Sequence, residues 1–230
     1  MPVLEIITSS GFGSVLGMRH ALEPDHLAAV STLVSGERSG YKAALLGMCW
    51  GLGHTVALVL AGVTLLVLRA ELPARVSDLF ELAVAVMLVG LGLRAIYYAA
   101  RQGSNGPMHL HRHHGIVHRH AAVPSHVHIG HWTLARRPLL VGAVHGLAGS
   151  GALTALVLAT LPSTAARLTY LALFGLGSTV GMAALSGLLG WPIARFGSHH
   201  AVIRGVSLLV GAMSTVLGLV WGYPLLARIF

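Results

Sequence analysis

Cysteine is almost absent from this sequence of 230 residues, in which Cys49 is the single example. One cysteine cannot form an internal disulfide framework, a CxxC redox pair or a four-cysteine zinc site. The same absence excludes a membrane carrier of reducing equivalents that works through a dithiol. Any metal site in this chain must therefore use other ligand types.

Charged residues are also scarce, at 10% of the chain, whereas hydrophobic residues make up 55% and the mean hydropathy is +0.76. A soluble domain carries about 25% charged residues, so this chain has too few for a water-facing surface. The net charge of +8 comes from basic residues scattered over short hydrophilic joints, which form no single face for nucleic acid. We therefore expect an integral membrane protein with the lipid bilayer, and no nucleic acid, as a partner.

Long apolar segments predict an all-α protein with six transmembrane helices, since a membrane helix needs about 20 apolar residues. The first span is interrupted: two short apolar halves flank the polar segment Arg19 to His26, which contains Pro24. Five further spans are expected at residues 43–68, 79–100, 138–166, 168–194 and 205–227. The 29 glycines recur at small-xxx-small spacing, which is typical of closely packed membrane helices.

Basic residues between the spans predict the orientation, because cytoplasmic loops are enriched in arginine and lysine. If the spans alternate, one side holds nine basic residues and the other holds four. The first set should then be cytoplasmic, with both termini outside the plasma (bacterial inner) membrane. The two sets are Arg38, Lys42, Arg101, Arg112, Arg119, Arg136, Arg137, Arg195 and Arg204 against Arg69, Arg75, Arg167 and Arg228.

Two short motifs recur in the second half of the chain. The segment 17–22 resembles 142–147 at an offset of 125, and 51–56 resembles 175–180 at an offset of 124. Spans one to three therefore repeat as spans four to six, and because three is odd the second unit must be inverted in the membrane. Inverted repeats are common in secondary transporters, whose sites lie near mid-membrane on broken helices. The predicted units are residues 1–100 and 138–230, joined by a loop at 101–137.

Five ionisable side chains fall inside the predicted spans, where they are costly and by default mark a pathway or a site. Imidazole and carboxylate ligands suit nickel, cobalt or zinc, and they suit calcium or magnesium poorly. Unwinding at Pro24 would let residues on both sides of it approach one ion. The predicted metal ligands are His20, Asp25, His26, His54 and His145. Each histidine could instead hydrogen-bond a neighbouring helix.

The segment His20-Ala-Leu-Glu-Pro-Asp25-His26 has the H-x4-D-H form of the nickel/cobalt transporter family, and Gly51-Leu-Gly53-His54-Thr55 is similar to its second signature. The chain most resembles the urease-accessory nickel permease branch of that family. The resemblance implies selective movement of Ni²⁺ or Co²⁺. It also implies that His20, Asp25 and His26 are essential and that His54 contributes.

A histidine-rich tract lies between the two repeats, with nine histidines in 23 residues and no acidic residue. Such a composition builds no core and predicts a flexible, cytoplasmic metal-binding loop. It could act as a sink for imported ion, as a sensor, as a feeder for export, or only as a linker. The histidines are His109, His111, His113, His114, His118, His120, His126, His128 and His131.

The leading hypothesis is a secondary permease for Ni²⁺ and also Co²⁺, with uptake for the maturation of nickel enzymes. No Walker A motif is present, so an ion gradient, the membrane potential or an outside partner must drive transport. The transported ion is the only expected metal, with no prosthetic group. Alternatives left open are an efflux carrier, a membrane metal-dependent enzyme and a haem-binding electron carrier. A homo-oligomer is also left open.

Overall fold

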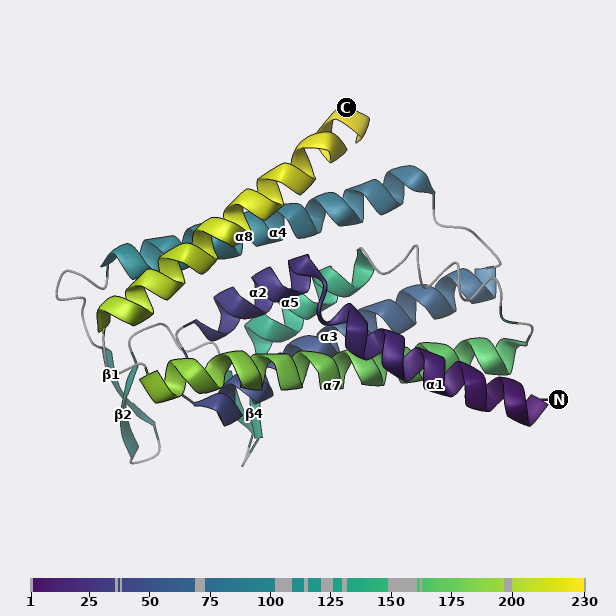
Figure 1. The fold of residues 1–230 in the computed structure, drawn as a ribbon, viewed down its shortest axis with the longest axis horizontal. Helices are drawn as coiled ribbons and strands as arrows, with labels where there is room; N and C mark the ends of the chain where they lie inside the picture. Colours follow the sequence, from purple (N-terminus) through teal and green to yellow (C-terminus); the bar gives the residue numbers. More distant parts are fainter. Residues whose placement is uncertain are drawn as a thin grey trace.

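The computed structural model describes residues 2–35, 37, 39–68, 73–101, 109–113, 116–120, 126–129, 132–148, 161, 163–196 and 200–229. Seven helices and four short strands lie in these ranges (Figure 1). The helices are α1 (Pro2–His20), α2 (Pro24–Val34), α3 (Gly40–Leu68), α4 (Ala74–Arg101), α5 (Arg136–Leu147), α7 (Thr164–Phe196) and α8 (His200–Ile229). The strands are β1 (His109–His113), β2 (Ile116–His120), β3 (His126–Ile129) and β4 (Trp132–Ala135).

Four of these helices, α3, α4, α7 and α8, are long and apolar enough to cross a membrane. They correspond to the second, third, fifth and sixth predicted spans, each extended by a few residues. The chain is therefore a helical membrane protein. The fourth predicted span begins with α5, but residues 149–160 lie outside the described part of the chain.

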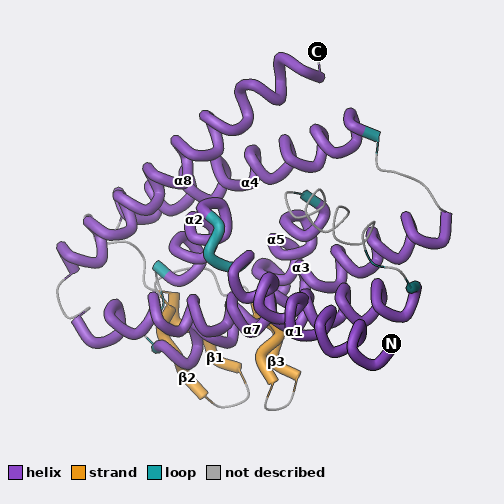
Figure 2. Tube along the Cα trace, turned by 45° about the vertical axis from the view of Figure 1, so that its right-hand side comes forward, coloured by secondary structure: helices purple, strands orange, loops and turns teal. Residues whose placement is uncertain are grey.

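The polar segment of the first predicted span separates α1 from α2. Helix α1 ends at His20, and α2 begins at Pro24 after Glu23 adopts an extended backbone with φ −64° and ψ 148°. Proline disfavours helical geometry in the residue before it but is well suited to the first turn of a helix. Figure 2 shows the loop between the two helices near the middle of the view, away from both ends of the chain; Ala21 in it is buried, whereas Leu22 is 57% exposed.

Helices α3 and α7 pack against each other, α1 lies along α7, and α5 lies along α3. The hydroxyl of Thr55 on α3 donates a 2.8 Å hydrogen bond to the carbonyl of Gly175 on α7, and it lies 2.9 Å from the Thr179 hydroxyl. Gly47 lies against Met182 while Gly62 lies against Leu171, so the two helices run in opposite directions.

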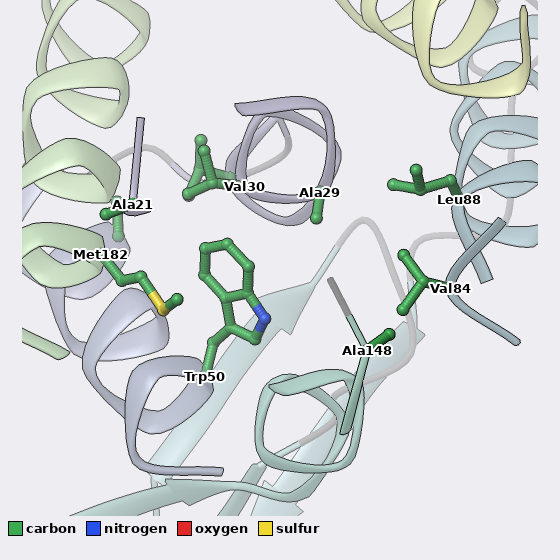
Figure 3. Packing of buried hydrophobic residues seen from close by; sticks show 10 residues of the cluster. Ala21, Ala29, Val30, Trp50, Val84, Leu88, Ala148 and Met182 are labelled. Atoms are coloured by element: carbon green, nitrogen blue, oxygen red, sulfur yellow. The ribbon is translucent and has the colours of Figure 1, made fainter. Parts of the chain in front are cut away.

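Helices α4 and α8 form a second pair, which contacts the other helices mainly through α2 (Figure 1). A buried apolar cluster joins the two parts. Figure 3 shows Trp50 of α3 at its centre, with Ala29 and Val30 of α2 beside it and Val84 and Leu88 of α4 on the far side. This cluster packs α2 between the two helix pairs.

The described residues of the histidine-rich tract form two short antiparallel hairpins, which the sequence did not predict. Strands β1 and β2 pair antiparallel with His109 opposite His120 and His111 opposite His118, and β3 pairs antiparallel with β4. Leucine, valine and isoleucine alternate with the histidines in these segments, and β-branched residues favour strands. His114 and His131 lie outside the described residues.

Candidate metal centre

The structure brings together all five residues predicted as metal ligands. His20 ends α1, Asp25 and His26 lie in the first turn of α2, His54 is in the middle of α3, and His145 is near the end of α5. Each of the five is at most 4% exposed. The break between α1 and α2 turns His20 and His26 toward each other, whereas a continuous helix would direct residues six apart differently.

His26 occupies the middle of the group. Its ring centroid lies 4.3 Å from that of His20, 4.0 Å from that of His145 and 5.4 Å from that of His54. These separations leave no room for a macrocycle between two axial histidines, so the arrangement does not fit a haem site. They do fit a compact site for one small ion.

The Asp25 carboxylate joins two of the histidines. Oδ1 lies 3.1 Å from His26 Nδ1, and Oδ2 lies 2.7 Å from His145 Nε2, 120 residues further along the chain. When His26 Nδ1 carries the proton and donates to Asp25, the lone pair on His26 Nε2 is free for a metal. A carboxylate behind a histidine in this way sets its tautomer and orientation and raises its basicity.

Glu23 holds His20 in the same manner, with Oε1 3.0 Å from His20 Nδ1. The sequence did not indicate the direction of this side chain, because it lies next to Pro24. The extended backbone at Glu23 and the helical end at His20 bring the two together. Two of the histidines thus have a carboxylate on Nδ1 that leaves Nε2 available.

Several buried ring nitrogens have no hydrogen-bond partner among the described residues: His20 Nε2, His26 Nε2, and both nitrogens of His54. Buried polar groups without a partner are costly, so a cluster of them on three helices is a candidate place for a bound ion. One ligand atom from each of His20, His26 and His54 lies within 4.8 Å of the others, and the same holds for Asp25, His26 and His145. His26 belongs to both groups.

Trp50 forms an apolar wall beside these groups, a role that the sequence did not indicate. Its ring centroid lies 5.4 Å from that of His26 and 5.7 Å from that of His145. An apolar shell excludes water and strengthens electrostatic interactions at the ligands. Only the packing of α3 against α2 and α5 reveals this contact.

Glycines allow His145 to reach the group. A Cβ on Gly142 would collide with the Trp50 carbonyl oxygen, and one on Gly146 would collide with the backbone of His54. Helix α5 therefore approaches α3 more closely than larger residues permit. The histidines of the tract belong to a different part of the molecule, where α4 ends and α5 begins.

A sequence model of a protein family, NicO, described as high-affinity nickel-transport protein, matches residues 7–218. The chain belongs to the NicO family. This confirms the family resemblance drawn from the H-x4-D-H segment. It also places the chain among transporters rather than enzymes.

Relatives of this NicO chain come from bacteria and plants. It is 32% identical to the urease accessory protein UreH of Bacillus sp. (strain TB-90), over 98% of this chain and 95% of that protein. It is 30% identical to the chloroplast protein FOR GROWTH AND FERTILITY 1 of Arabidopsis thaliana, over 80% of this chain and 50% of that one. It is also 30% identical to a high-affinity nickel transport protein of Cupriavidus necator, over 41% and 31% of the two chains. No solved structure matches the chain.

Proposed function

We propose that this chain is a secondary permease for Ni²⁺, and also for Co²⁺, that binds the ion at the candidate metal centre. The observation that carries the proposal is the convergence of unpartnered, buried imidazole nitrogens from α1, α2 and α3. Imidazole is a good ligand for nickel and cobalt, and its affinity for them is too similar to separate the two. His20, His26 and His54 offer one ligand group, and Asp25, His26 and His145 offer a second.

The proposed scaffold is an inverted repeat of six spans, with units 1–100 and 138–230. Matching contacts on the two sides of the bundle support it. Gly17 lies against Phe174, and the equivalent Gly142 lies against Trp50, the equivalent of Phe174. Equivalent helices α3 and α7 run in opposite directions, as inversion requires.

In this scaffold the ligands would lie close to the pseudo-symmetry axis that relates the two units. His20 and His145 are equivalent positions at the offset of 125, and their rings lie at similar distances from His26, at 4.3 and 4.0 Å. The site therefore lies where the two repeats meet, so that rocking one repeat against the other could expose it to either side in turn. Ser178 takes the place equivalent to His54, so the first repeat supplies more of the ligands.

The direction of transport and the orientation complete the proposal. The excess of basic residues on one side favours a cytoplasmic histidine-rich tract and external termini in the bacterial inner membrane. Uptake for nickel-enzyme maturation is supported by the relative named as a urease accessory protein. An ion gradient or the membrane potential would supply the energy.

Cell-associated nickel and cobalt in a host without its own nickel carriers test this function. Cells with this chain should accumulate more nickel than the empty host, and Asp25→Ala/His26→Ala at matched expression should remove the gain. A fall in nickel that the same variant abolishes would make the chain an exporter. If neither metal changes, the transport proposal is wrong.

The histidine-rich tract is proposed as an accessory metal-binding site on the cytoplasmic side. The register of β1 and β2 places two pairs of histidines directly opposite each other, which is a favourable spacing for a shared ion. Replacing His109, His111, His118 and His120 by Asn should lower the number of nickel ions bound per purified chain. Binding to the tract should also weaken below about pH 6.5, where imidazole takes up a proton.

Equilibrium dialysis with nickel measures this number, and Arg112→Asn/Arg119→Asn, which alters the same hairpin without removing a histidine, is the matched control. Unchanged binding in the fourfold variant would show that this hairpin does not bind nickel. Nickel transport through the metal centre should persist in both variants, because neither alters its five residues.

A further inference from the structure

Acidic residues are confined to the first part of the chain. All seven aspartates and glutamates lie in residues 1–81, whereas residues 82–230 carry ten arginines and no acidic residue. Two of the acids, Glu23 and Asp25, contact histidines of the metal centre. The chain therefore has too few acids to pair with most of these arginines, and anions from outside the chain can take their place.

Arg94 and Arg101 are two of these arginines, and they lie near the end of α4 that leads to the histidine-rich tract. Arg94 is partly buried and Arg101 is exposed. The structure pairs neither guanidinium group with a described carboxylate, in contrast to Arg228, which lies 3.6 Å from Asp78. Two cations thus lie close together on one helix without an acidic partner in the described part of the chain.

Two tyrosines orient these guanidinium groups. The guanidinium carbon of Arg94 lies 5.3 Å from the centre of the Tyr98 ring, and that of Arg101 lies 4.4 Å from the centre of the Tyr97 ring. The tyrosine rings contact each other edge to face, with 5.6 Å between their centroids. Arg94 therefore extends toward the end of the helix and Arg101 extends back by one turn, so both charges lie near the level of the tyrosines. Stacking on an aromatic ring orders a guanidinium group and leaves the donors at its edge free for an anion.

These four residues, which we call the Arg–Tyr cluster, lie at the end of an exposed apolar stripe. Leu88 and Gly92 of α4 are buried against α8, whereas Val86, Leu93 and Tyr97 are 63%, 54% and 49% exposed. Residues seven and four positions apart lie on one face of a helix, so the stripe leads directly to the cluster. A lipid molecule would place its acyl chains along the stripe and its headgroup at the arginines.

The cluster lies at the depth of the lipid headgroups. Helix α4 has 28 residues and is about 42 Å long, whereas the hydrocarbon core of a bilayer is about 30 Å thick. The last turns of the helix, which end at Arg101, therefore reach the headgroup region, and a long arginine side chain such as that of Arg94 extends toward it.

Arg204 continues the positive charge onto α8, which lies beside α4 (Figure 1). Gly92 lies against Gly211 and Gly218 lies against Ala85, so the two helices are antiparallel and Arg204 is level with the end of α4. Arg204 is exposed. Three arginines from two helices therefore surround one level of the membrane surface.

We propose that the Arg–Tyr cluster binds the phosphate group of an anionic phospholipid, in the leaflet on the side of the histidine-rich tract. Guanidinium groups bind phosphate through paired hydrogen bonds, and tyrosine is enriched at the headgroup level of a bilayer. The negative headgroup supplies the charge that the second part of the chain lacks. The bound lipid would also tie the end of α4 to the start of α8, where no acidic side chain can do so.

Native mass spectrometry of the detergent-purified chain tests the proposal, because it counts the lipid molecules that remain bound. The wild type should bind phosphatidylglycerol about tenfold more tightly than phosphatidylcholine with the same acyl chains, since basic residues near the surface attract anionic lipids. Arg94→Gln/Arg101→Gln should reduce this preference to less than about twofold. Each single variant should lose about threefold, which provides a test even if the double variant does not fold.

Two further variants separate this cluster from a general attraction of positive charge. Arg75→Gln removes an exposed arginine from the other end of α4 and should keep the preference of the wild type. Arg94→Lys/Arg101→Lys keeps both charges but lacks the flat donor pairs, and it should bind phosphatidylglycerol about threefold more weakly than the wild type.

Three results would overturn the lipid site. The first is equal binding of phosphatidylglycerol by the wild type and the two single glutamine variants, and the second is an equally large loss in Arg75→Gln. The third is full displacement of the lipid by an equal concentration of inorganic phosphate, which would make free phosphate the ligand. None of these measurements depends on nickel transport, so the lipid site and the proposed function succeed or fail separately.

Discussion

Replacing His26 by alanine is expected to reduce nickel transport to the level of the empty host. His26 is the residue shared by the two possible ligand groups, and its ring lies between those of His20 and His145. Without His26, the first group keeps only His20 and His54, and the second keeps only Asp25 and His145. Loss of a partner behind a ligand costs about 10-fold to 100-fold in metal affinity, so loss of a shared ligand should cost more than about 100-fold.

A graded series separates ligands from the residues that orient them. Asp25→Asn keeps the shape of the side chain but weakens its bonds to His26 and His145, and it should lower apparent nickel affinity about 10-fold to 100-fold. Glu23→Gln should have a smaller effect through His20. The measurement is uptake against nickel concentration, with equal protein in the membrane.

Ser214→Ala is the control for this series, since it removes a buried hydroxyl that donates to the Leu88 carbonyl and to none of the five residues of the metal centre. It should transport nickel like the wild type. Transport by His26→Ala at the wild-type rate and affinity would show that the ion does not bind at this group.

Gly142→Ala is expected to prevent stable assembly of the helices. A Cβ at this position would meet the carbonyl oxygen of Trp50 and lie 2.9 Å from the backbone nitrogen of His54, so α5 would have to move away from α3. Overpacking of this kind costs about 1–3 kcal/mol and sometimes more, and backbone atoms cannot relax as a flexible side chain can. The same shift would carry His145 away from Asp25, so any protein that remains should also transport poorly.

Gly90→Ala is the matched control, because nothing lies within 4 Å of a Cβ built there. Alanine is favoured over glycine in a helix by about 1 kcal/mol, so this variant should be as stable as the wild type or more so. The difference in stability is measured by heating the detergent-purified proteins and then determining by size-exclusion chromatography how much folded protein remains. Equal stability of Gly142→Ala and the wild type would contradict the close contact of α5 with α3.

Much of the fold could be predicted from local patterns. Apolar length identified the four continuous helices, and Pro24 with its polar neighbours identified the place where α1 and α2 separate. The hairpins in the histidine-rich tract were not predicted, because its composition indicates disorder, whereas the Val and Ile residues among the histidines favour strands.

Residue type and spacing alone were sufficient to identify the family motif and to select the five side chains of the candidate metal centre. An ionisable group in an apolar span is costly wherever the helices pack, so its cost can be read from the chain itself. Contacts between side chains on different helices could not be predicted in this way. That Asp25 contacts His145 and that Trp50 lies beside His26 follow from how the helices pack.

The two carboxylates outside the predicted site show the same limit. Glu81 could be read from sequence as a residue near the end of a span whose side chain reaches the interface. The tertiary structure instead places it with Asp25 in the lining of one small pocket, and it places Glu23 against His20. The sequence by itself determined which groups are costly in the membrane and where the first span breaks, since both depend on neighbouring residues. Only the packing of the helices decided which groups from different helices meet, because contacts such as that of Asp25 with His145, 120 positions further along, depend on the arrangement of the whole bundle.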